Sequence, residues 1–140
     1  MKKKKRICFI CYRKFPDTNF ENYSKFVAKN GYDVSVISYL CKNQTKYEEV
    51  DKRKIWRIKL PGTKSNRKKI LYFIKETAKI LKRQNFSIIH IHHTCKYFLL
   101  IKLLTFKRAI YIYHITSYPI GESHFQSLKQ MTVMCLQTLI

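Results

Sequence analysis

A short apolar segment at residues 86–93, Phe-Ser-Ile-Ile-His-Ile-His-His, constrains the fold of this chain more than any other segment. It contains three isoleucines and follows a long basic segment with helical periodicity. This combination is typical of a buried parallel strand in an α/β sheet. Its histidines stand toward the carboxyl end, where open α/β sheets place their ligand sites. Residues 109–114, Ala-Ile-Tyr-Ile-Tyr-His, repeat the arrangement. The sequence therefore predicts two neighbouring strands that end in histidine above one crevice.

The rest of the chain alternates between strand and helix patterns. Strands are predicted at residues 7–12, 33–39, 55–60, 86–93 and 109–114, and helices at residues 18–30, 67–84, 96–105 and 122–139. Residues 40–54 are polar and are expected to form a surface excursion, while residues 55–60 alternate apolar and basic side chains as an edge strand does. With 140 residues, the chain is expected to form one α/β domain, a Rossmann-like parallel sheet flanked by helices.

The charge of the chain is strongly unbalanced, with 29 Lys and Arg against 8 Asp and Glu, a net charge of +21. Such a field attracts anions, among them phosphorylated lipids, nucleotides, nucleic acids and anionic membranes. A codon bias toward A and T in the gene explains the excess of basic residues equally well, because Lys outnumbers Arg by 22 to 7.

The predicted helix at 67–84 concentrates this charge on one side. Its expected outer side carries Lys68, Lys75, Lys79, Lys82 and Arg83, and its expected apolar side carries Ile70, Leu71, Ile74, Ala78 and Leu81. We call the five basic residues the α-helical basic patch and expect it to face an anionic membrane or a lipid-phosphate acceptor. Nucleic acid is the less favoured partner. Binding it would need aromatic side chains interleaved with Lys and Arg on an exposed face, whereas most aromatic residues here lie in strand patterns.

Two familiar cofactor motifs are missing from the sequence. The chain has only three glycines (Gly31, Gly62 and Gly121), and they form neither the G-x-G-x-x-G nor the P-loop spacing. This argues against a dehydrogenase, and no cofactor is expected in this chain.

Histidines and cysteines offer weaker signals. His90, His92, His93 and Cys95 are residue types that suit zinc, but they lie in one stretch without a second ligand pair, so no metal is predicted. Cys8 and Cys11 have redox spacing, but within a strand they face opposite sides, which favours core cysteines. The five cysteines form no disulfide framework, and a cytoplasmic location is expected, at most with contact to the cytoplasmic face of a membrane.

His114 is the most informative single residue. It ends an apolar strand and precedes the polar loop that contains Thr116 and Ser117, at the expected crevice. A hydrogen-bonded structural histidine is an equal alternative. The sequence offers no Ser-His-Asp set and no carboxylate pair placed for hydrolysis.

Short stretches along the whole chain resemble the N-terminal domain of GT-B glycosyltransferases of family 4, the large retaining nucleotide-sugar family. They are Lys5–Ile10 with Arg13-x-x-Pro16-Asp17-Thr18, then residues 28–36, 55–61, 88–92 and 110–114. The sequence departs from the family at three points. The glycine-rich first loop is absent, Ser87 replaces a usual aspartate, and Asn19 replaces a frequent arginine. Some members place the cleft histidine two residues later, at Thr116 here.

The resemblance implies that residues 1–140 are the acceptor-side half of a GT-B fold, without the donor-binding C-terminal domain. His114 would be the catalytic residue that faces the transferred sugar. The acceptor-side cleft would be lined by Arg13, Asp17, Thr18, His90, His92, His93, Thr116 and Ser117. The chain would then transfer sugar from a nucleotide sugar only with a donor-domain partner chain, or it would be a truncated inactive relic. The alternative is a non-catalytic basic module that binds nucleic acid or anchors a partner enzyme at an anionic membrane.

Overall fold

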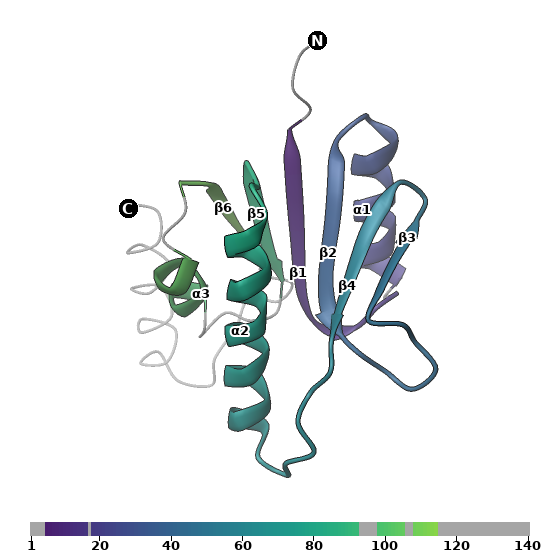
Figure 1. The fold of residues 1–140 in the computed structure, drawn as a ribbon. Helices are drawn as coiled ribbons and strands as arrows, with labels where there is room; N and C mark the ends of the chain where they lie inside the picture. Colours follow the sequence, from purple (N-terminus) through teal and green to yellow (C-terminus); the bar gives the residue numbers. More distant parts are fainter. Residues whose placement is uncertain (1–4, 17, 93–97, 106–107, 115–140) are drawn as a thin grey trace, which may run out of the picture.

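The computed structural model describes residues 5–16, 18–92, 98–105 and 108–114 (Figure 1). Its strands are β1 (Arg6–Lys14), β2 (Asp33–Tyr39), β3 (Tyr47–Val50), β4 (Arg53–Ile58), β5 (Ile88–His92) and β6 (Ile110–His114), and its helices are α1 (Thr18–Lys29), α2 (Asn66–Arg83) and α3 (Phe98–Thr105). They form one sheet in the order β3-β4-β2-β1-β5-β6, parallel throughout except for the β3–β4 pair. The predicted Rossmann-like α/β fold is confirmed. The predicted helix at 122–139 lies outside the described residues.

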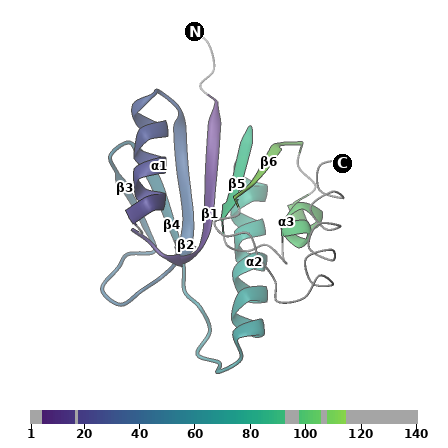
Figure 2. The same ribbon diagram turned by 180° about the vertical axis from the view of Figure 1, so that it is seen from behind.

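Helices cover both faces of the sheet. Helix α1 lies on one face, and helices α2 and α3 lie on the other (Figures 1 and 2). Strand β1 lies in the interior of the sheet, and its alternate side chains pack into the core on opposite faces. Cys8 packs with Phe73 and Leu81 on the α2 side, whereas Cys11 packs with Phe20 on the α1 side. The two cysteines thus face opposite sides of the sheet, as the sequence predicts. Burial raises the pKa of the Cys8 thiol well above its ordinary value, so this side chain stays protonated at neutral pH.

The prediction of an edge strand at residues 55–60 is wrong. Strand β4 pairs with β2 on one side and with the short antiparallel strand β3 on the other, so β3 forms the edge. Strand β3 lies inside the expected surface excursion at 40–54, where its sequence Tyr-Glu-Glu-Val shows little apolar alternation. The tight turn between β3 and β4 places Asp51 and Lys52 at positive φ, 50° and 61°. The ring of Tyr47 lies across the hairpin at 4.5 Å from that of Trp56.

Helix α2 confirms the predicted amphipathic helix with one correction. Leu71, which the sequence analysis placed on the apolar side, is 48% exposed, while Phe73 is fully buried. The buried residues Phe73, Ile74, Thr77, Ala78 and Leu81 recur every three or four positions, and this stripe leaves Leu71 at its margin. Thr77 was not expected there, because a threonine reads as a surface residue in a helix pattern.

Candidate functional site

The carboxyl ends of the parallel strands meet along one edge of the sheet, at its lower end in Figure 1. Strand β1 leads to α1 on one face, whereas β5 leads to α3 on the other, so the direction of winding reverses between these neighbouring strands. Open α/β sheets bind their ligands at such a switch point. Cys11 of β1 and His92 of β5 stand opposite each other there.

Histidines end both strands beside the switch point. His92 of β5 and His114 of β6 are register partners, which confirms that two adjacent strands end in histidine at the same edge. His92 is 8% exposed, and its ring lies 5.2 Å from that of Phe20 in the first turn of α1. The same Phe20 ring lies 6.3 Å from His90, which also packs at 5.2 Å against Phe9. His90 and His92 therefore share a face, with His90 one step deeper below the edge.

The loop between β1 and α1 forms the other side of this edge. Arg13 and Lys14, the last residues of β1 before this loop, are exposed, and Phe15, its first residue, is buried. Gln44, from the loop after β2, donates a hydrogen bond from Nε2 to the carbonyl oxygen of Phe15 at 2.8 Å. The Oε1 atom of Gln44 accepts a hydrogen bond from the backbone amide of Cys41 at 3.0 Å. Gln44 thus links the loop after β2 to the loop between β1 and α1. This role could not be predicted, because Gln44 lies in a largely polar stretch without a structural pattern.

The structure brings together some of the predicted cleft residues. Arg13, His92 and the strand position of His114 lie at the carboxyl edge, and Thr18 begins α1 beside it. His90 lies deeper on the same strand as His92. Asp17, His93, Thr116 and Ser117 lie outside the described residues. Imidazole groups at such an edge can donate hydrogen bonds to, or accept them from, the hydroxyl groups of a ligand. In the described part of the chain, no three His, Cys, Asp or Glu side chains converge as a metal site would require.

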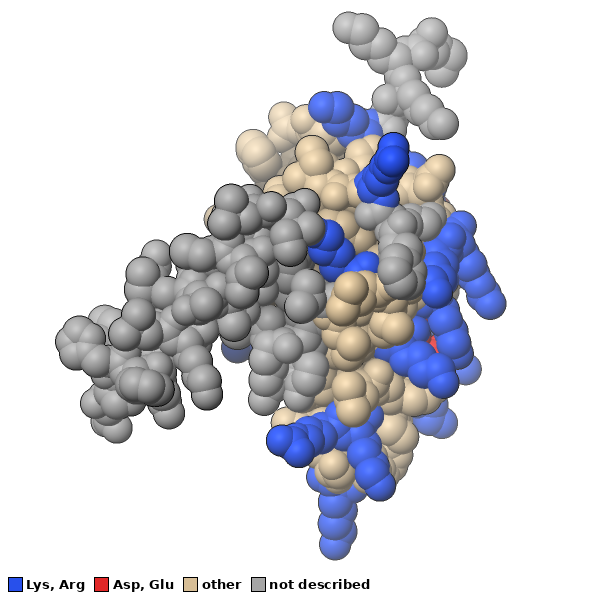
Figure 3. Space-filling view, turned by 90° about the vertical axis from the view of Figure 1, so that its left-hand side faces the viewer, with Lys and Arg blue, Asp and Glu red and all other residues tan. Residues whose placement is uncertain are grey.

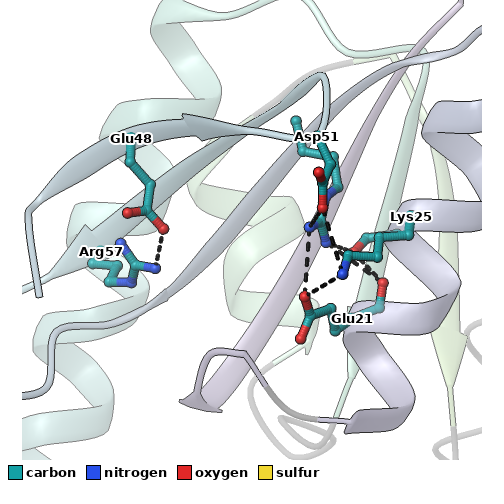
Figure 4. Close-up of polar contacts among 7 residues, drawn as sticks. Glu21, Lys25, Glu48, Asp51 and Arg57 are labelled. Carbon is teal, nitrogen blue, oxygen red and sulfur yellow. Dashed lines mark hydrogen bonds and ion pairs between the residues drawn. The ribbon is translucent and has the colours of Figure 1, made fainter.

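Two buried arginines of β4 were missed by the sequence analysis. Arg53 is 1% exposed and donates to Ser24 Oγ at 2.8 Å and to Asp51 Oδ2 at 3.2 Å. Glu21 lies 3.7 Å from the same guanidinium, and Lys25 bridges Glu21 and Asp51 at 2.9 and 3.4 Å (Figure 4). This network joins α1 to the β3–β4 hairpin.

The second arginine, Arg57, closes the other end of the same hairpin. It is 6% exposed, pairs with Glu48 and donates a hydrogen bond to the carbonyl oxygen of Thr45 at 3.2 Å (Figure 4). Both arginines lie on the same face of β4 as the buried Ile55. From the sequence, Arg53 was expected in the surface excursion and Arg57 in an edge strand. Their role is to hold the hairpin and the loop before it in place.

Comparison with known proteins assigns the family. The profile of a family described as "Glycosyl transferase 4-like" matches residues 6–137. The chain belongs to the glycosyl transferase 4-like family. This glycosyltransferase domain has the candidate site at the edge of the sheet where open α/β folds bind ligands. No curated protein matches its sequence.

Solved structures share the fold of this glycosyl transferase 4-like domain. Sucrose-phosphate synthase from Thermosynechococcus elongatus is 12% identical, with a TM-score of 0.64 over 94% of this chain. The chain spans only 39% of the length of that synthase structure. The C-terminal domain of a hydrogenase from Pyrococcus furiosus is 7% identical, with a TM-score of 0.59 over 80% of this chain and 92% of that domain. Since a hydrogenase domain and sucrose-phosphate synthase share this architecture, the likeness describes the fold alone.

Proposed function

We propose that this domain is the acceptor-binding half of a retaining glycosyltransferase that uses a nucleotide sugar. The observation that carries the proposal is the pair of histidine-ended strands, β5 and β6, beside the switch point of a glycosyl transferase 4-like domain. A second Rossmann-type domain, on a partner chain or elsewhere in the same protein, would hold the donor. The shared fold with a synthase structure of much greater length supports this division.

The chemistry of retaining transfer fits a divided site. The reaction depends on orienting the acceptor hydroxyl toward the sugar and on stabilising charge that develops on the leaving phosphate. In our proposal His114 faces the transferred sugar, while Arg13 and His92 position the acceptor at the mouth of the switch point. Asp17, Thr18, His93, Thr116 and Ser117 complete this acceptor side. The donor domain contacts the phosphate, so this domain alone does not complete the reaction.

A titration of the isotopically labelled chain, followed by amide NMR, tests this assignment. Saccharide acceptors are expected to shift the amide signals at the ends of β1, β5 and β6, including Arg13, His92 and His114. Nucleotide sugars are expected to produce no saturable shift at that edge, because their site lies on the other domain. Val50, in the edge strand β3, serves as the internal control. Saturable nucleotide-sugar shifts at the carboxyl edge, or acceptor shifts confined to β3, would contradict the assignment.

We propose in addition that α2 rests on the cytoplasmic face of an anionic membrane. All five residues of the α-helical basic patch are exposed, and Lys and Arg side chains line the right-hand side of Figure 3, where α2 lies. Leu71 and Tyr72, 48% and 41% exposed, add apolar surface among these bases. Basic side chains together with exposed apolar ones are the combination by which helices lie in a membrane interface. Within the described ranges, no helix is long and apolar enough to cross a membrane.

Charge reversal in α2 is expected to abolish binding to anionic vesicles. Each lysine near an anionic surface contributes about 1 kcal/mol, so replacing Lys75, Lys79 and Lys82 with Glu should weaken binding by more than about 100-fold. Sedimentation with phosphatidylserine vesicles measures this effect. The matched control replaces the exposed Lys42, Lys46 and Lys59 with Glu, which changes the net charge equally away from α2.

An equal loss in both triple variants would mean that only the overall charge matters. Unchanged vesicle binding, together with steeply salt-dependent binding to DNA or RNA, would favour a nucleic-acid module instead.

A further inference from the structure

A pocket of about 760 Å³ opens at the amino edge of the sheet, opposite the candidate functional site. It lies where β1, β5 and β6 begin, at the top of Figure 1. The side chains that matter for its chemistry come from three separate segments: Lys5, Arg6, Asn85, Phe86, Ser87 and Arg108. Its size lies within the range of about 300–1,000 Å³ that is common for small-molecule sites.

Arg6 is held rigidly beside this pocket. Its Nε atom donates to Asp33 Oδ2 at 3.0 Å, and its Nη2 atom donates to Gln84 Oε1 at 2.7 Å. The guanidinium carbon lies 5.2 Å from the centre of the Phe86 ring, and Phe86 itself is buried. Because its geometry is fixed by these contacts, Arg6 loses little conformational freedom when an anion approaches.

The electrostatic balance at this edge favours an anion. Lys5, Arg6 and Arg108 bring three positive charges to the pocket, and no carboxylate is among its lining residues. Asp33, which pairs with Arg6, also pairs with Lys54 at 3.3 Å. This single carboxylate therefore neutralises only part of the positive charge of Arg6. The exposed Lys5 and Arg108 stand at the rim, and Ser87 adds a hydroxyl group that can donate a hydrogen bond.

We propose that this pocket binds a phosphate or pyrophosphate group. Lys5 and Arg108 contact the anion directly, Ser87 and Asn85 offer neutral hydrogen-bond donors, and Arg6 supplies a fixed positive field. A soluble phosphorylated molecule and a phospholipid headgroup present the same group. The site is separate from the proposed acceptor site, because the two lie at opposite edges of the sheet. Failure of one assignment therefore leaves the other standing.

Calorimetric titration of the whole chain with inorganic pyrophosphate tests this proposal. Saturable binding is expected, and Arg108→Ala should weaken it about tenfold, since a charge-assisted hydrogen bond is lost. The matched control is Lys59→Ala, which removes one exposed positive charge at the other edge of the sheet. It should leave the affinity within about twofold of the original value. Absence of saturable binding, or an equal loss in Lys59→Ala, would overturn the proposal in favour of diffuse charge attraction.

A second arm identifies the source of the phosphate. Vesicles that contain phosphatidic acid are compared with the same vesicles without it, for the original chain and for Arg108→Ala. If Arg108→Ala also weakens phosphatidic acid binding, the pocket takes a lipid headgroup. If only pyrophosphate binding falls, it takes a soluble phosphorylated molecule.

Discussion

Replacing Arg53 with methionine is expected to lower the free energy of unfolding by about 2–3 kcal/mol. The Arg53 guanidinium lies 2.8 Å from Ser24, 3.2 Å from Asp51 and 3.7 Å from Glu21. Methionine fills much of the same volume but can form neither the hydrogen bond nor the ion pairs. Breaking a fully buried pair typically costs about 3–5 kcal/mol. The expected loss is smaller here, because Asp51 is 55% exposed and regains water. Urea unfolding measures the change.

The neighbouring Lys54 provides the matched control for Arg53. Lys54 is 37% exposed and pairs with Asp33 at 3.3 Å, so Lys54→Met removes the same charge and a partly exposed ion pair. Such pairs contribute about 1 kcal/mol or less. Equal losses in the two variants would show that the Arg53 network does not hold the β3–β4 hairpin to α1.

Replacing His114 with alanine is expected to lower sugar transfer by about 100-fold or more, measured on the native complex with its donor domain. The expectation follows from our assignment of His114, at the end of β6 opposite His92, to the side of the site that faces the transferred sugar. The loss should appear in kcat, since the group acts on the reacting centre more than on the bound substrate.

Ile112→Ala serves as the control for His114→Ala. Ile112 stands two residues earlier in β6 and is 45% exposed, so its truncation should leave both folding and transfer nearly unchanged. If His114→Ala retains full transfer, the domain acts as an anchor for a partner enzyme and not as part of the catalytic cleft.

The sequence predicted those parts of the fold in which local patterns agree with the tertiary structure. The apolar run of β5 and the alternation that separates Cys8 from Cys11 both follow from burial on two faces of one sheet. Strand β3 could not be predicted, because its residues carry no apolar pattern and it exists by pairing with β4. Arg53 was expected in the surface excursion at 40–54 and Arg57 in an edge strand, since charged residues are buried only when tertiary partners satisfy them.

The site was predictable to a similar extent. The juxtaposition of His92 and His114 follows from two strands that end in histidine and lie side by side. Gln44 and the amino-edge pocket could not be foreseen. Gln44 acts on Phe15, 29 residues away, and the pocket gathers side chains near residues 5, 86 and 108. Such contacts depend on the assembled sheet and leave no local signal in the sequence.

Native mass spectrometry of the protein, purified gently from its own cells, tests the central claim most directly. We expect this domain to be found together with a second Rossmann-type domain, in a stoichiometric complex or in the same polypeptide. That assembly should bind a nucleotide sugar. A lone chain that binds neither a nucleotide sugar nor such a domain would contradict the assignment as the acceptor-binding half of a glycosyltransferase.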